Sequence, residues 1–208
     1  MLTRKITTVL FFLFTQVCYT SSQKFSFVWS ASLDKVSGKA SSLETSTLPS
    51  FTFNGKKKRT NVLILHDFFL NYPCWLCNWK ILGGLFRPNS NKCEVSVCDS
   101  IFGCHLLRFG KPRDISNFIR GKQISIEIPI VGGLLARKPG GCLRFSVAQD
   151  TGILKTEIDS YCPWIAGDTP ISCLREGLYL NSQSFFHAYV MWRFHRDCFY
   201  LMKSKNCR

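Results

Sequence analysis

The clearest pattern in the chain is an alternation of apolar and polar residues between positions 122 and 162. Apolar residues fall at every second position in the runs 124–130 and 143–147, and the run 154–158 alternates in the same way with Thr156 between Leu154 and Ile158. A period of two is typical of a strand with one buried face. The turn sequences Lys-Pro-Gly-Gly and Asp-Thr-Gly separate the runs. The pattern therefore predicts an antiparallel meander, apolar on one face and hydrated on the other.

The longest predicted helix covers residues 182–203, near the C-terminus. Its apolar residues lie nearly all the way round a helical wheel, which is typical of a helix buried between layers or against lipid. A three-stranded sheet leaves its apolar face bare unless another element covers it. We therefore expect an α+β fold in which this C-terminal helix covers the apolar face of the meander.

Shorter elements are predicted upstream of the meander. The continuous apolar run 61–65 indicates a buried strand, and the aromatic-rich stretch after it indicates a short helix in the core. The same aromatic residues would also suit a bilayer surface or a pocket wall. Two strands, a helix and two loops are expected next: strands at 93–99 and 106–109, a helix at 112–120, and loops at 83–84 and 87–91.

An antiparallel sheet followed by one long C-terminal helix resembles the helix-grip arrangement of the START and Bet v 1 families. The resemblance covers residues 60–204 and concerns the order of elements, without a specific motif. In those families the sheet curls around the final helix and leaves an apolar cavity between them. The resemblance therefore implies binding of a lipid or another hydrophobic small molecule. It implies cavity walls formed by Ile126, Ile128, Phe145, Ile158 and Trp192.

The first 59 residues differ in composition from the rest. Arg4 and Lys5 precede an apolar run at 6–17 and small residues follow, so residues 1–20 are predicted to be a signal peptide. Residues 21–59 are rich in serine and poor in acids, and we expect this leader to be disordered or removed. It is either a plain linker or similar to a plastid transit peptide.

The remaining residues, 60–208, are predicted to form a single domain. This domain would be secreted, would stay in an endomembrane lumen, or would reach a plastid through a two-part leader.

The net charge of +14 does not by itself indicate a polyanionic partner. Residues 1–59 hold nine of the 27 basic residues and two of the 13 acidic ones, so residues 60–208 carry a net charge of +7. Half of the net charge therefore belongs to the leader. We expect no nucleic-acid partner, and we expect a hydrophobic small molecule or a membrane surface instead.

Ten of the 11 cysteines lie after the predicted signal peptide. In an oxidising compartment they would pair as disulfides, whereas in a plastid stroma they would stay reduced. Four of them approximate the spacing of a four-thiolate zinc site, with Cys104 and His105 as further ligands: Cys74, Cys77, Cys93 and Cys98. Three interpretations therefore stay open, namely disulfides, free buried thiols and structural zinc.

Cys74 and Cys77 also form a C-x-x-C pair, which is the pattern of a thiol-disulfide oxidoreductase. A thioredoxin fold requires alternating helices and strands after the pair, whereas this chain continues into a meander. The sequence contains no G-x-S-x-G nucleophile elbow, no P-loop and no dinucleotide fingerprint. The first hypothesis is therefore a non-enzymatic domain that binds a hydrophobic ligand. The alternatives are a thiol-disulfide oxidoreductase and a structural protein stabilised by zinc or disulfides.

Overall fold

The computed structural model describes residues 25–34, 37–49, 56–78, 86–91, 94–99, 104–116, 123–136, 138–148, 150–164, 177, 179 and 181–206. Within these residues, nine strands form one antiparallel sheet in the order β1-β2-β9-β8-β7-β5-β4-β3, and β6 also pairs with β7. The strands are β1 (Phe27–Leu33), β2 (Ala40–Thr47), β3 (Phe86–Asn91), β4 (Glu94–Asp99), β5 (His105–Gly110), β6 (Arg113–Asp114), β7 (Gln123–Gly132), β8 (Cys142–Ala148) and β9 (Ile153–Tyr161).

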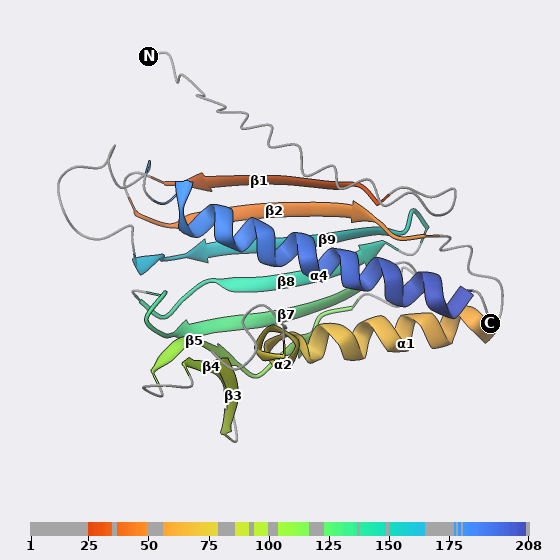
Figure 1. Ribbon diagram of the computed structural model, residues 1–208, viewed down its shortest axis with the longest axis horizontal. Helices are drawn as coiled ribbons and strands as arrows, with labels where there is room; N and C mark the ends of the chain where they lie inside the picture. Colours follow the sequence, from red (N-terminus) through yellow and green to blue (C-terminus); the bar gives the residue numbers. More distant parts are fainter. Residues whose placement is uncertain are drawn as a thin grey trace, which may run out of the picture.

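The helices form a second layer on one face of this sheet (Figure 1). They are α1 (Lys56–Leu70), α2 (Tyr72–Cys77) and α4 (Gln183–Asn206). Helix α4 packs against β1 and β2, α1 packs against β7, and α2 packs against β3 and β4. The α+β prediction, with an antiparallel sheet and a long C-terminal helix, is therefore confirmed. The sequence placed this helix over the meander, whereas α4 packs against β1 and β2 and α1 packs against β7.

The helix-facing surface of the sheet changes from polar to apolar between β2 and β7. Strand register places Glu44, Thr156, Phe145 and Ile126 side by side on β2, β9, β8 and β7. Since neighbours in register point to the same face, this row is polar under α4 and apolar under α1. All four side chains are fully buried.

Aromatic side chains fill the apolar part of the layer. The ring of Phe194 in α4 lies 5.1 Å from that of Phe68, 4.9 Å from Trp75, 5.1 Å from Tyr72 and 5.0 Å from Phe145. Such centroid distances correspond to direct ring contact. Helices α1, α2 and α4 and strand β8 are therefore joined by one aromatic cluster.

The run 61–65 forms part of α1, where the sequence predicted a strand. Leu65 and Phe69 are fully buried, whereas the side chain of Leu63 is 55% exposed. Buried positions four residues apart belong to one face of a helix. The run is apolar throughout, so its own period did not distinguish a helix from a strand.

Strands β1 and β2 lie inside the segment 21–59, which the sequence predicted to lack regular structure. Three of the four inward positions of β2 are polar, namely Ser42, Glu44 and Ser46, and the fourth is Ala40. Because these buried residues are polar, β2 shows no alternation of apolar and polar residues. The sheet therefore begins upstream of the predicted domain boundary at residue 60, while the predicted signal peptide lies outside the described residues.

Two further segments differ from the predictions. Residues 87–91 belong to strand β3, although Pro and Asn in this stretch indicated a loop. The described part of the predicted helix at 112–120 contains the short strand β6, which pairs with β7. Positions 117–120 lie outside the described residues. The predicted strands at 93–99 and 106–109 correspond to β4 and β5.

Candidate functional site

A group of buried polar side chains lies between β2, β9 and α4. His195 of α4 is fully buried, and its Nδ1 and Nε2 atoms lie 2.8 Å from the hydroxyls of Ser46 and Thr156. Burial, and then the nearby positive charge of His187, lower the pKa of His195 to about 3. A neutral imidazole donates one hydrogen bond and accepts one, so both hydroxyls are matched. His195 therefore ties α4 to two strands.

Glu44 lies on the same face of β2, and its side chain is 0% exposed. The Nε2 atom of His187 is 3.2 Å from Oε1 of Glu44, which forms an ion pair when the imidazole is protonated. Among the described residues, neither oxygen of Glu44 accepts a geometrically sound hydrogen bond. The buried hydroxyls of Ser42 and Ser184 also lack such a partner within the described chain. Since buried polar groups are normally hydrogen-bonded, this region has unused hydrogen-bonding capacity.

The charge of Glu44 contributes to raised pKa values of two buried tyrosines. Burial, and then the negative charge of Glu44, raise the pKa of Tyr179 to about 12. The same two causes, in the same order, raise the pKa of Tyr72 well above its ordinary value. Both phenols therefore stay neutral near neutral pH and keep their hydrogen-bond donors. We call Ser42, Glu44, Ser184 and His187 the polar pocket, and the name denotes this set of buried donors and acceptors between β2 and α4.

Sequence reasoning did not identify this group as a site. The alternation Ser42, Glu44, Ser46 in β2 is a period of two, but with polar residues on the buried face. His187 and His195 lie eight positions apart on one helix, and this spacing belongs to no specific motif. Their partners in β2, Glu44 and Ser46, lie about 150 positions earlier in the chain, so only the fold brings them together.

The predicted cavity-wall residues occupy two kinds of position. Four of them lie on strands and are buried or partly buried in the layer beneath the helices: Ile126, Ile128, Phe145 and Ile158. Trp192 lies on α4, where its ring stacks on Tyr189 at 5.8 Å and the guanidinium of Arg196 lies 4.7 Å from it.

Three of the four cysteines in the predicted zinc pattern lie on neighbouring elements. Cys74 and Cys77 lie on α2, and Cys98 lies on the neighbouring strand β4. Burial, then Cys74 and Cys98, raise the pKa of Cys77 to about 12. The Sγ atom of Cys98 lies 3.3 Å from Nδ1 of His105, and Cys93 falls outside the described residues.

No disulfide occurs among the cysteines that the structure describes, which are Cys74, Cys77, Cys98, Cys104, Cys142, Cys162 and Cys198. Across the same described ranges, no three His, Cys, Asp or Glu side chains are arranged to hold a metal ion.

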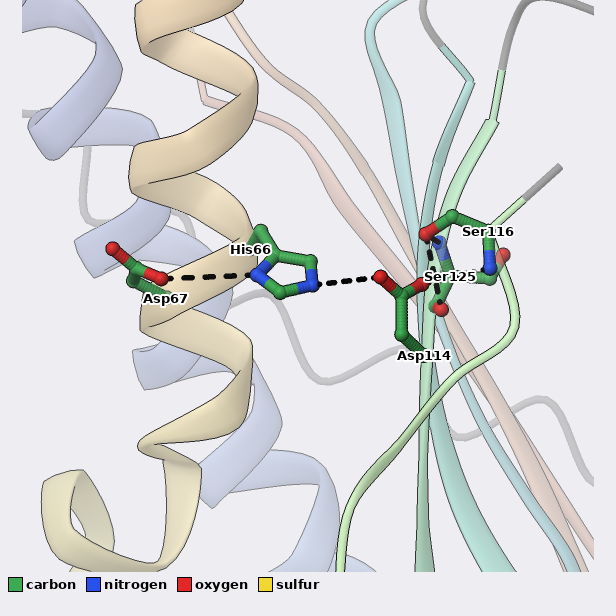
Figure 2. A network of polar contacts seen from close by, with 5 residues as sticks. All are labelled: His66, Asp67, Asp114, Ser116 and Ser125. Atoms are coloured by element: carbon green, nitrogen blue, oxygen red, sulfur yellow. Dashed lines mark hydrogen bonds and ion pairs between the residues drawn. The ribbon is translucent and has the colours of Figure 1, made fainter. Parts of the chain in front are cut away.

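A separate polar network joins α1 to β6 and β7 (Figure 2). His66 donates from Nε2 to Oδ2 of Asp114 at 3.0 Å, and its Nδ1 lies 3.7 Å from Asp67. The backbone N–H of Ser116 donates to the other oxygen of Asp114 at 2.9 Å, and the Ser116 hydroxyl bonds the backbone of Ser125. Burial raises the pKa of Asp114, but the hydrogen bonds from Ser116 and the contact with His66 outweigh it and leave this pKa below its usual value. The network fixes α1 against the edge of the sheet.

No protein-family model and no curated protein sequence matches this chain. Among the described helices, none is long and apolar enough to cross a membrane. The function must therefore be argued from the geometry of the chain itself.

Proposed function

We propose that this protein is a non-enzymatic binding domain that holds a lipid or another amphipathic small molecule between its sheet and α4. The polar part of the molecule contacts the polar pocket, and its apolar part lies along the apolar residues of β7 and β8. The fully buried Glu44 carries this proposal: its Oε1 faces His187 at 3.2 Å, and its Oε2 accepts no hydrogen bond from the described residues.

The fold supports the helix-grip comparison in its general features. The described strand pairings are antiparallel, and the long last helix crosses one face of the sheet (Figure 1). In the START and Bet v 1 families, the ligand lies between these two elements. The row from Glu44 to Ile126 offers an amphipathic molecule a polar end and an apolar end in the same layer.

The chemistry of the polar pocket favours a head group that donates hydrogen bonds. A carboxylate only accepts hydrogen bonds, whereas the hydroxyls of Ser42 and Ser184 can donate or accept. A hydroxyl or amine head would satisfy Glu44, and the cost of burying an unsatisfied carboxylate would then decrease. An anionic head would face the negative charge of Glu44 and is disfavoured.

The environment of His195 supports a binding role over acid–base catalysis. Both ring nitrogens are used by hydroxyls of the scaffold, and the side chain is fully buried. A general base near neutral pH needs a pKa close to the working pH. The pKa of about 3 leaves His195 far from that range.

The proposal is tested by titrating the protein with N-phenyl-1-naphthylamine, an apolar amine whose fluorescence rises in apolar surroundings. Ser184→Leu places a large apolar group in the polar pocket, and Glu44→Gln removes its charge. Both variants are expected to weaken dye binding by roughly tenfold, which corresponds to about 1.4 kcal/mol. Solvent extraction of the wild-type protein followed by mass spectrometry is expected to release a bound amphipathic molecule.

Matched controls separate binding from folding. Ser182→Leu changes an exposed serine at the start of the same helix, and Glu157→Gln changes a glutamate on the opposite face of the sheet. Neither change should alter dye affinity. Folded wild-type protein that takes up no dye and releases no small molecule would refute the proposal, as would equal losses in the test and control variants. Trp192→Arg places a charge at a predicted cavity-wall position of α4 and is expected to weaken dye binding in the same assay.

A thiol-disulfide oxidoreductase is the second candidate, and one observation favours it. Cys74 is partly exposed, whereas the neighbouring Cys77 is buried and its pKa is raised to about 12. An accessible first thiol with a protonated partner one turn later suits attack followed by resolution. Wild-type protein should then reduce a disulfide substrate in the presence of a dithiol, and Cys74→Ser should abolish this activity. Wild-type protein without reductase activity would exclude this function.

A further inference from the structure

Three chain segments meet beside the N-terminal end of α4. The connection after β7 and the segment after β9 are joined by a hydrogen bond from the backbone N–H of Trp164 to the carbonyl of Leu135 at 3.0 Å. They are also joined by the bridge between Ala136 and Pro163. Gln183 of α4 donates from Nε2 to the same Leu135 carbonyl at 3.2 Å. In Figure 1, the ends of β7 and β9 and the start of α4 lie at one end of the sheet.

Large apolar side chains from each of these segments face solvent. Leu134 is 56% exposed, Trp164 is 65% exposed and Phe186 is 47% exposed. Phe185 beside them is 42% exposed. We call these four residues the apolar rim. Single exposed apolar residues are common, but a group drawn from three segments at one end of a molecule marks an interaction surface.

We propose that the apolar rim inserts into the surface of an anionic lipid bilayer, where the polar pocket exchanges its amphipathic ligand. The membrane contact rests on its own observations, while the exchange step rests on the function proposed above. Tryptophan, phenylalanine and leucine are the residue types that enter the boundary between head groups and acyl chains.

Charge at the rim favours an anionic bilayer over a protein partner. The stretch 134–141, which connects β7 to β8, contains two basic residues and no acidic one. Lys138 in this connection is exposed. Basic residues next to inserting apolar side chains increase the attraction to negatively charged lipids. Asp159 lies two positions after Glu157 on β9, so it belongs to the strand face that carries the Arg144–Glu157 ion pair.

The rim adjoins the polar pocket along α4. Gln183 contacts the rim segments through Leu135 and donates to the phenol oxygen of Tyr161 at 2.8 Å. The next residue, Ser184, is buried and belongs to the polar pocket, and His187 follows one turn later. A molecule leaving a bilayer at the rim would therefore meet the pocket within about two helical turns, or roughly 10 Å.

The test is co-sedimentation of the full chain with vesicles of phosphatidylcholine, with and without phosphatidylserine. Trp164→Ser and Phe186→Ser are each expected to reduce affinity for the anionic vesicles by roughly tenfold, because each removes a large apolar side chain from the contact. Lys138→Glu should weaken binding only when phosphatidylserine is present. The apolar run at residues 6–17 is common to all variants, so it cancels in the comparison.

Matched controls keep exposure constant while changing position. Tyr200→Ser removes an aromatic side chain at the other end of α4. This side chain is 47% exposed, the same fraction as Phe186 at the rim. Leu63→Ser removes an apolar side chain of α1 that is 55% exposed, which matches Leu134. Both controls should keep wild-type affinity for the vesicles. Equal losses in rim and control variants would overturn the proposal.

Two further readouts distinguish the possible failures. Rim variants should bind N-phenyl-1-naphthylamine as the wild type does, because the polar pocket is unchanged. If the wild type binds no dye but its vesicle binding still depends on the rim, the proposed ligand is refuted and the membrane contact is kept. Sedimentation equilibrium shows whether a second copy covers the rim: a wild-type dimer that Phe186→Ser dissociates, together with unchanged vesicle binding, would overturn the membrane proposal.

Discussion

Replacing His195 tests the buried polar layer most directly. The native pKa of this residue is lowered to about 3, whereas an unfolded histidine has a pKa of about 6.5. Between these values the unfolded chain binds one proton more than the native protein does. Stability therefore decreases as the pH falls from about 6.5 towards 3, and this contribution is fully present above pH 6.5.

The magnitude follows from the width of this window. One proton corresponds to 1.36 kcal/mol for each pH unit, so lowering the pH from 7 to 4.5 should cost about 2–3 kcal/mol through His195 alone. Gln at this position cannot titrate, so His195→Gln should remove this part of the pH dependence. It should also cost about 1 kcal/mol at pH 7, because one amide cannot match both hydroxyls.

The assay is urea unfolding of the wild type and of His195→Gln at pH 7 and pH 4.5. The free energy of unfolding should decrease by about 2–3 kcal/mol less in the variant than in the wild type. Carboxylates that titrate in the same range are present in both proteins and cancel in the difference. His105→Gln, which replaces an exposed histidine of β5, is the control for the loss of a histidine elsewhere in the chain. Identical pH dependence in the wild type and His195→Gln would show that the reasoning is wrong.

Three further predictions concern packing, an ion pair and a turn. Phe194→Ala should destabilise the protein by about 3–5 kcal/mol, since it removes the centre of the aromatic cluster, whereas the exposed Phe186→Ala should cost less than about 0.5 kcal/mol in the same urea titration. Asp114→Asn should cost up to about 1 kcal/mol at pH 7, and this cost should disappear in acid as the wild-type carboxyl is protonated; a constant cost in pH titrations would contradict the lowered pKa. Gly141→Ala should lower the melting temperature, because φ is +83° and the added Cβ would lie 2.7 Å from the Asp159 carbonyl oxygen; an unchanged melting temperature would disprove this.

The sequence alone was sufficient for the elements with a regular local pattern. Alternation in the three runs after residue 122 predicted β7, β8 and β9, and the long apolar helix predicted α4. Both patterns arise because side-chain direction repeats with the backbone geometry of a strand or a helix. The spacing of Cys74, Cys77 and Cys98 likewise identified residues that the fold places near one another.

Only the tertiary structure identified β2 as a strand of the sheet and revealed the polar pocket. The buried face of β2 is polar because it lies under α4, where His187 and His195 meet Glu44, Ser46 and neighbouring hydroxyls. The local pattern of β2 resembles that of a hydrated segment, because the α4 histidines that contact its buried polar side chains lie about 150 positions later in the chain. Local periodicity reports which way side chains point, whereas the partner that makes a buried carboxylate tolerable is set by long-range packing.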